Sequence, residues 1–343
     1  MLTTEAALTD TVKQGEDFRD DLRVATTPSK AKQLPPGRLK KLISINNWRS
    51  AFSIFQTLML LLTALAVALL VWQPVFLVIA VVVIGTQQHA LIVLAHDATH
   101  YRLFKTRTLN DLIGCICGTM AGISMRTYRI IHRLHHNHLY QEKDPDIPLH
   151  GGYPRGRAYL VRKLLQDLCG LTTWKTYGYF FGKLSSKTEK EECNRLLEDT
   201  SSRLLRAARI DRYIVATAHL TALATSILFG FALEYLVLWI LPLATVVPTL
   251  LRLRALCEHG AVLNFSSALT AARTNYPSKW FQWLLFPHHV NYHLEHHVYP
   301  AIPHYNLPAC HQQMMQLGML DNAEVRTIGK TLGMLFSDRS EDS

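Results

Sequence analysis

The chain has 343 residues, 49% of them hydrophobic, and a formal net charge of +10 at pH 7. A soluble chain of this length would ordinarily form two domains with dispersed hydrophobic residues, whereas here they are gathered into long uncharged stretches. The basic excess requires no nucleic acid, because loops that lie against anionic lipid carry the same charge. The composition therefore favours an integral membrane protein and argues against a nucleic-acid partner.

The N-terminal region is polar over its first 47 residues and lacks the hydrophobic core of a signal peptide. We expect residues 1–45 to form a disordered or interfacial tail, with a short helix near Leu39–Trp48. Residues 46–315 are expected to form one membrane domain, and residues 316–343 a C-terminal tail.

The first hydrophobic stretch covers residues 50–101, which contain no Lys or Arg and only one acidic residue, Asp97. As a single helix this 52-residue stretch would be about 78 Å long, well beyond the hydrocarbon thickness of about 30 Å. It must therefore turn back on itself, and residues 72–74 (Trp-Gln-Pro) are the natural turn. This predicts membrane-spanning helices over residues 51–71 and 74–95.

A second stretch, residues 213–251, also lacks Lys and Arg and contains one acidic residue, Glu234. Its two halves predict spans over residues 213–232 and 235–253. Prolines at positions 242 and 248 are expected to kink the last helix, which a membrane helix tolerates when neighbouring groups satisfy the freed carbonyls. The predicted fold is therefore all-α and polytopic, with four transmembrane helices in two hairpins.

Basic residues flank both hairpins, and the turns within the hairpins have none. Under the positive-inside rule, this distribution places both termini and the central segment in the cytoplasm. The segments outside the membrane are then expected to form a cytoplasmic helical cap.

Eight histidines lie in three clusters at the cytoplasmic ends of these helices or in the cap. Within each cluster, spacings of three or four residues place side chains on one helical face. Imidazole suits zinc, copper, iron and nickel, and a single ion rarely has more than four protein ligands. The clusters therefore predict two metal ions held together by His96, His100, His132, His135, His136, His293, His296 and His297.

His259 is a ninth candidate ligand, because it follows closely on the fourth predicted span. A role as a hydrogen-bond partner is equally open for it. The other histidines near the clusters, among them His138, His289 and His304, are interpreted as structural or as residues that support the ligands.

Metal-bound imidazoles need a hydrogen-bond partner on the other ring nitrogen, and this partner is usually a carboxylate. Six polar residues are interleaved with the clusters and are candidates for that supporting role. A solvated surface role stays open for each of them. They are Asp97, Asp144, Asp146, Glu258, Asn291 and Glu295.

The three histidine clusters have the patterns HDxxH (residues 96–100), HxxHH (132–136) and HxxHH (293–297), which we call the first, second and third box. Their order around two hydrophobic hairpins resembles the membrane fatty acid desaturase and hydroxylase superfamily. Residues 291–297 (NYHLEHH) and 299–303 (YPAIP) resemble the third box of its bacterial members, which favours a bacterial inner membrane over the endoplasmic reticulum. The resemblance covers roughly residues 45–315. It implies a non-haem centre of two iron ions that uses O2 as co-substrate and removes hydrogen from an unactivated C–H bond. His259 resembles an extra histidine that some members place between boxes two and three.

The resemblance also implies two partners. One is a lipid or fatty acyl substrate from the bilayer, for which Arg252, Arg254 and Arg273 are candidate headgroup ligands, although each is otherwise an ordinary solvated or lipid-facing charge. The other is a separate electron donor (ferredoxin, cytochrome b5 or a reductase), because nothing here resembles the cytochrome b5 domain fused to many relatives.

Desaturation of a fatty acyl chain is the expected reaction. Decarboxylation to a 1-alkene, acyl hydroxylation and carotenoid hydroxylation or ketolation stay open, because all use the same metal site and differ in how the substrate is placed. A histidine-rich metal transporter is disfavoured, because transport should place polar ligands near the bilayer midplane. Chain length, carrier, regiochemistry, the identity of the donor and the oligomeric state are left open.

Overall fold

The computed structural model describes residues 33–183 and 200–337. Most of the expected N-terminal tail and the last six residues lie outside the described part. Within it, a short helix α2 (Pro36–Leu42) precedes the first long helix. It ends earlier than the short helix expected near Leu39–Trp48.

The first hydrophobic hairpin is formed by α3 (Asn47–Leu70) and α4 (Pro74–Thr99). The Asn46 side chain accepts hydrogen bonds from two backbone N–H groups in the first turn of α3, which is the usual way to satisfy a helix N-terminus. Pro74 stands in the first turn of α4, where its missing N–H costs nothing. Two helices therefore form on either side of the turn expected at residues 72–74, and α4 continues past residue 95 to carry the first histidine cluster.

The second hydrophobic stretch begins with the long helix α11 (Ser202–Leu228). The return path is broken into α12 (Ala232–Tyr235), a π-helical turn η1 (Leu236–Ile240), α13 (Leu241–Ala244) and α14 (Val246–His259). Because Pro248 has no N–H to offer the carbonyl of Ala244, that carbonyl is free, and it accepts a hydrogen bond of 2.5 Å from Thr173 Oγ1. The helix thus breaks within the segment that contains both prolines, and a neighbouring segment satisfies the freed group.

Three helical segments among the described residues are long and apolar enough to cross a membrane: Asn47–Leu70, Pro74–Thr99 and Ala232–His259. Helix α11, which contains the third predicted span, is not among them. It begins in a charged segment with Asp211 and Arg212, and His219 interrupts its apolar run. The count of four spans therefore stays a prediction.

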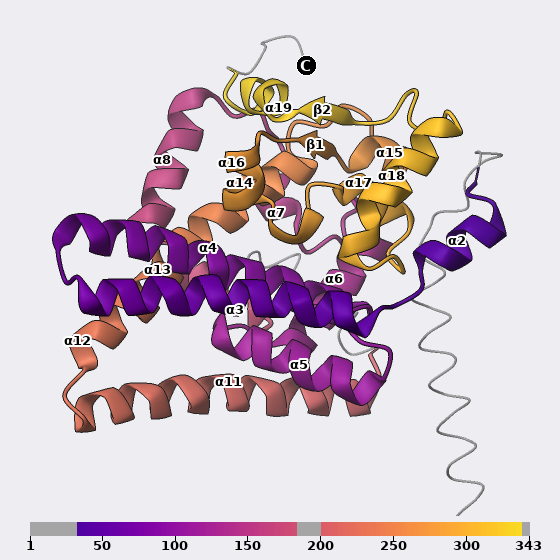
Figure 1. Ribbon diagram of the computed structural model, residues 1–343. Helices are drawn as coiled ribbons and strands as arrows, with labels where there is room; N and C mark the ends of the chain where they lie inside the picture. Colours follow the sequence, from indigo (N-terminus) through magenta and orange to yellow (C-terminus); the bar gives the residue numbers. More distant parts are fainter. Residues whose placement is uncertain (1–32, 184–199, 338–343) are drawn as a thin grey trace, which may run out of the picture.

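The remaining elements surround the first hairpin. In the central segment these are α5 (Arg107–Met120), α6 (Met125–Asn137), α7 (Ile147–His150), α8 (Arg157–Leu168) and α9 (Thr173–Phe180). After α14 come α15 (Ala268–Ala271), β1 (Thr274–Tyr276), α16 (Lys279–Leu285), η2 (Pro287–His289), α17 (His293–Val298), η3 (His304–Asn306), α18 (Leu307–Gln316), β2 (Val325–Thr327) and α19 (Ile328–Leu335). In Figure 1, α3 and α4 run side by side, with α5 and α11 on one side and the C-terminal elements on the other.

The fold is mostly helical, as expected, with one small sheet in the described part of the chain. Strand β1 pairs in parallel with β2, and Thr274 lies opposite Val325. Residues 325–335 come after the expected domain boundary at 315, yet they belong to the packed structure: Leu335 is fully buried in the same hydrophobic cluster as Leu256 of α14.

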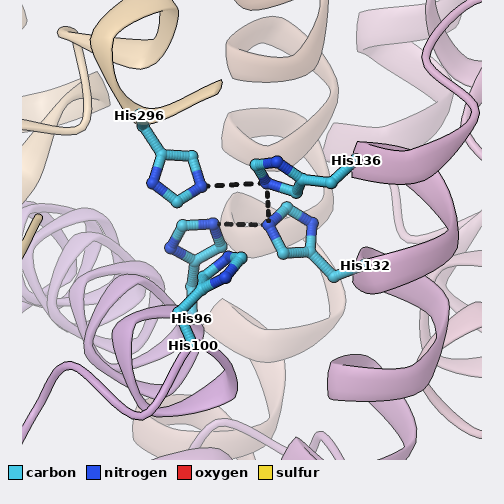
Figure 2. Close-up of side chains that lie close together, drawn as sticks. All are labelled: His96, His100, His132, His136 and His296. Atoms are coloured by element: carbon cyan, nitrogen blue, oxygen red, sulfur yellow. Dashed lines mark hydrogen bonds between the residues drawn. The ribbon is translucent and has the colours of Figure 1, made fainter. Parts of the chain in front are cut away.

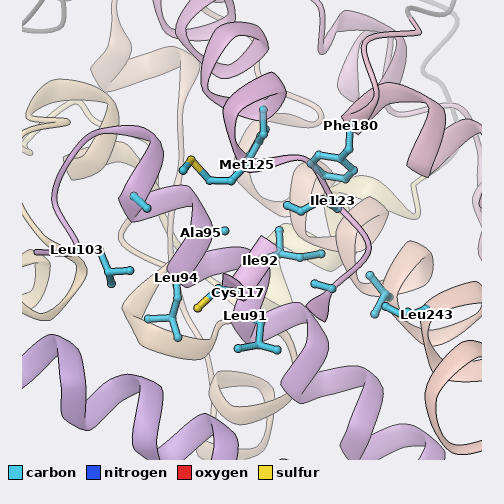
Figure 3. Close-up of a cluster of buried hydrophobic side chains, with 14 of the residues drawn as sticks. Leu91, Ile92, Leu94, Ala95, Leu103, Cys117, Ile123, Met125, Phe180 and Leu243 are labelled. Carbon is cyan, nitrogen blue, oxygen red and sulfur yellow. The ribbon is translucent and has the colours of Figure 1, made fainter. Parts of the chain in front are cut away.

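Helix α4 lies at the centre of the molecule. Leu91, Leu94 and Ala95 of α4 pack with side chains from other segments, including Met125 and Leu243 (Figure 3).

Helix α5 approaches α4 closely because Gly114 has no side chain. A Cβ atom at Gly114 would lie 2.3 Å from the Cβ of Ala98. This close packing fixes the end of α4, where the first histidines stand.

Helix α6, which carries the second histidine cluster, is anchored at its N-terminus by α11. Ser124 caps α6 by accepting from the N–H of Thr127. The buried carboxylate of Asp211 accepts hydrogen bonds from Ser124 Oγ at 2.8 Å and from the N–H of Arg126 at 3.0 Å. A negative charge is favourable at this end of a helix, so Asp211 holds both the start and the position of α6.

Replacing Asp211 with Ala should leave two donors, the buried Ser124 hydroxyl and the N–H of Arg126, without their charged acceptor. We expect a loss of about 1–3 kcal/mol in the free energy of unfolding, measured by thermal or denaturant unfolding of the protein in detergent. The matched control is Asp321→Ala, which removes an exposed carboxylate. Equal stability of the two variants would contradict the anchoring role.

Candidate metal centre

Four segments bring the candidate ligands to one place. His96 lies in the last turn of α4 and His100 directly follows it, α6 carries three histidines, α14 ends at His259, and α17 carries the last three. All of these side chains are buried except that of His100, which is half-buried. The nine imidazoles form two groups, which share no residue.

The first cluster consists of His96, His100, His132, His136 and His296, whose candidate ligand atoms all lie within 4.8 Å of one another. Figure 2 shows these rings pointing toward one another from three segments. The Nε2 atom of His132 lies 2.8 Å from that of His96 and 3.0 Å from that of His136. The Nε2 atom of His136 is also 3.0 Å from that of His296.

The second cluster consists of His135, His259, His293 and His297. The Nε2 atom of His259 lies 2.8 Å from that of His293 and 3.2 Å from that of His135. The Nε2 atoms of His293 and His297 are 3.0 Å apart. His259, the less certain ninth candidate from the sequence, therefore lies among the other three nitrogens of this group.

Both clusters fit a metal ion. A ring nitrogen carries either a proton or a lone pair, so hydrogen bonds could join these nitrogens only where donors and acceptors alternate. One cation accepts lone pairs from all of them, and metal–nitrogen bonds of about 2.0–2.1 Å place ligand atoms at separations like those seen here. Burial lowers the pKa of His132, His136 and His297 well below the usual value, so these rings are neutral, as ligands must be.

His135 has the clearest carboxylate support. Its Nδ1 donates to Asp144 Oδ1 at 2.9 Å and lies 3.5 Å from Asp146 Oδ2. Burial lowers the pKa of His135, but Asp144 and Asp146 outweigh burial and raise it to about 9. With Nδ1 directed at Asp144, Nε2 faces the second cluster, where a cation would replace the second ring proton.

Glu258 supports the same cluster less directly. Its Oε1 atom lies 3.6 Å from His293 Nδ1 and 3.2 Å from Arg254 Nε. Glu258 thus stands between a candidate ligand and a buried cation.

Two of the other candidate supporting residues contact histidines outside the clusters. Asp97 accepts from His304 Nδ1 at 2.6 Å and lies 3.9 Å from His96. Glu295 accepts from His311 Nδ1 at 2.6 Å and from Thr274 Oγ1 at 2.5 Å. Their closest contacts therefore fix the first and third box helices to the segment that contains η3 and α18.

Asn291 also lies away from the rings. Its side chain donates to the carbonyl of Asn275 at 2.9 Å and accepts from Gln282 at 3.2 Å. These contacts hold the loop before α17, and so Asn291 acts on the third box through the backbone.

Sequence reasoning gave His304 a structural or ligand-supporting role without naming its partner, and it did not single out His311. Neither residue stands at ligand spacing from a box, and the carboxylates that bind them were assigned to other histidines. The only signal in the sequence is that each of the two carboxylates stands inside a histidine box. That signal does not identify the partner.

The candidate headgroup arginines all have partners within the protein. Arg252 binds Asp167, Arg254 pairs with Glu258, and the fully buried Arg273 pairs with Glu324 and donates to the carbonyls of Cys257 and Gly260. These contacts give each guanidinium a structural role, and binding of a substrate headgroup stays a prediction.

Comparison with known proteins decides the family. The fatty acid desaturase model matches residues 70–327, which include all nine histidines and two of the three apolar segments, Pro74–Thr99 and Ala232–His259. The chain belongs to the fatty acid desaturase family. It is therefore an oxidoreductase of the membrane, which sets aside the metal transporter.

Individual relatives agree with this family. The chain is 28% identical to dihydrorhizobitoxine desaturase of Bradyrhizobium elkanii over 69% of its own length and 67% of the relative. It is 26% identical to the sn-1 oleoyl-lipid 12-desaturase of Anabaena variabilis, over 75% of each chain. A shorter match, 34% identical over 91 residues, is to the sn-1 acyl-lipid omega-3 desaturase (ferredoxin) of a Nostoc strain.

Single replacements should separate ligands from neighbouring histidines. We expect about two metal ions per wild-type chain, and His96→Ala, His135→Ala and His296→Ala should each lower this number and abolish turnover, because each removes a nitrogen from a cluster. Elemental analysis of the purified proteins, run beside an activity assay, is the measurement. His138→Ala is the control, since His138 contacts Gln141 outside the clusters. If this control loses as much metal as His135→Ala, the assignment of the second box is wrong.

Replacing Asp144 with Asn tests the carboxylate support. Asn keeps the shape but loses the negative charge that orients His135, so metal affinity should fall about 10–100-fold. Competition with a chelator measures this affinity. Unchanged retention of both ions would contradict a supporting role for Asp144.

Proposed function

We propose that this desaturase uses two iron ions, held by the nine histidines, and O2 to introduce a double bond into a fatty acyl chain. The observation that carries the proposal is the convergence of nine imidazoles into two adjacent clusters, with no carboxylate in either. His135 lies 5.9 Å from His136 between ring centroids, yet the two belong to different clusters. The two ions would therefore lie close together.

The chemistry of the ligand set supports iron and an oxidative reaction. Bound iron would supply the electron transfer that activates O2. Overall, one O2, two electrons and two protons are consumed as a CH2–CH2 unit becomes CH=CH and two water molecules form. The chain's own residues hold the ions with neutral nitrogen and keep the site buried, so that O2 activation is shielded from bulk water.

Desaturation is favoured over the sibling reactions because it is the reaction in the names of all three relatives. Two of those names specify acyl lipids, whereas the third specifies dihydrorhizobitoxine. We extend the acyl substrate to this chain because the clusters stand at the ends of apolar helices, where an acyl chain can enter from the bilayer.

We propose that a separate protein supplies the two electrons. Ferredoxin is one candidate donor, and it is named for one relative.

We propose that α11 is the fourth span and that both termini and the metal centre face the cytoplasm of a bacterial inner membrane. The charge distribution supports this orientation, since basic residues flank the apolar pairs and are missing from the turns within them.

The product distinguishes desaturation from its closest alternative. With a carboxyl-labelled fatty acyl substrate, O2 and an added electron donor, we expect an unsaturated product that keeps the label, because the oxidised carbons lie within the chain. Mass spectrometry of lipids and headspace is the measurement, with His96→Ala protein as the inactive control. Labelled CO2 formed together with a volatile alkene would favour decarboxylation on the same metal site.

A further inference from the structure

His150 is not part of any histidine box, yet it lies beside the second cluster. It is the last residue of the short helix α7, and its side chain is only 1% exposed. Neither ring nitrogen has a hydrogen-bond partner among the described residues. Buried polar atoms are nearly always paired. We therefore expect a ring nitrogen of His150 to form a hydrogen bond with a group close to it.

Asp144 is the group that faces the ring. Its Oδ1 atom accepts from His135 Nδ1 and from the N–H of Asp146, both at 2.9 Å. Its Oδ2 atom accepts from the N–H of Tyr140 at 2.9 Å and lies 3.7 Å from His150 Nε2. A carboxylate has about four acceptor positions, so three are filled and His150 faces the fourth.

A small movement would complete this set. A shift of less than about 1 Å would bring Nε2 of His150 within hydrogen-bond distance of Oδ2. The carboxylate would then be held by two backbone N–H groups and two imidazoles. A carboxylate held in this way cannot rotate, and the ring of His135 is fixed with it.

His150 also contacts the other side of the second cluster. Its ring centroid lies 5.0 Å from that of His259 and 4.7 Å from that of Tyr140. The hydroxyl of Tyr140 donates to the backbone carbonyl of His259. The ring of His150 thus lies between Asp144, which holds His135, and Tyr140, which holds His259. Both of these histidines belong to the second cluster, and no ring of the first cluster is in contact with His150 in the described part of the chain.

We propose that His150 is a positioning residue of the second cluster, which donates to Asp144 and thereby orients His135 as a ligand. The inference rests on the proposed metal centre. Candidate ligand atoms of His150, Asp144 and His135 also lie within 4.8 Å of one another. Because Asp144 already accepts a hydrogen bond from His135 Nδ1, we assign these three residues to the support of one ion and not to a third metal site.

Two replacements of His150 separate its hydrogen bond from its bulk. His150→Phe keeps a ring of similar shape and removes the donor, whereas His150→Gln keeps an N–H near the position of Nε2. His138→Phe is the control, because it makes the same chemical change in a histidine outside the clusters. The purified full-length proteins are loaded with Co2+ as the probe, and the affinity of each ion is measured by chelator competition and by the ligand-field absorption of Co2+.

In His150→Phe, one of the two ions should bind about 10–100-fold more weakly, with a changed absorption band for that ion only. His150→Gln and His138→Phe should resemble the wild type. The proposal is overturned if His150→Phe retains both ions, if His150→Gln loses as much as His150→Phe, if both ions weaken equally together with lower thermal stability, or if three ions bind per wild-type chain. A wild type that binds no pair of ions would instead refute the metal centre itself.

Discussion

The structure depends on one constraint: nine imidazoles must keep their nitrogens pointed at one another in a buried place. Neutral rings with facing lone pairs repel, and protonated rings would repel more strongly, so a cation that accepts the lone pairs would make this arrangement favourable. The constraint commits α4, α6, α14 and α17 to a common point. The break in the last apolar segment and the close approach of α5 to α4 are consistent with it, because each brings a ligand-bearing helix to that point.

Hydrogen bonds to buried carboxylates hold these helices in place. Asp97 ties the end of α4 to His304, Glu295 ties α17 to His311, and Asp211 ties α6 to α11. Removing one partner of such a buried hydrogen bond typically costs about 1–3 kcal/mol, because it leaves a buried polar group unsatisfied. The carboxylates inside the histidine boxes are therefore divided between two tasks, orienting rings and fixing the backbone that carries them.

The sequence was sufficient for the parts of the structure that follow from local pattern. Uncharged length predicted the first hairpin, and spacing predicted which histidines gather. The prolines predicted a kink in the last apolar segment, where the helix breaks before α14. The sequence could not assign each histidine to a cluster. His135 and His136 are neighbours on α6, but consecutive helical residues point about 100° apart, so they enter different clusters, and the same holds for His296 and His297.

The sequence also could not predict hydrogen-bond partners that follow no repeating pattern. His304 and His311 come from irregular or unrelated segments, and only the folded chain brings them to Asp97 and Glu295. The third predicted span stays a prediction for a different reason, since α11 combines a charged beginning with an apolar end and is not among the three helices of the described part that are apolar enough to cross a membrane.

The distribution of ligands along the chain has a consequence for biogenesis. The first cluster draws four of its five histidines from α4 and α6, whereas the second has only His135 and His259 until α17 arrives. During synthesis, four nitrogen donors for one ion are present some 160 residues before the last donor emerges, and four donors already complete a common coordination shell. The second cluster, by contrast, cannot gather more than two of its four nitrogen donors until α17 has been synthesised.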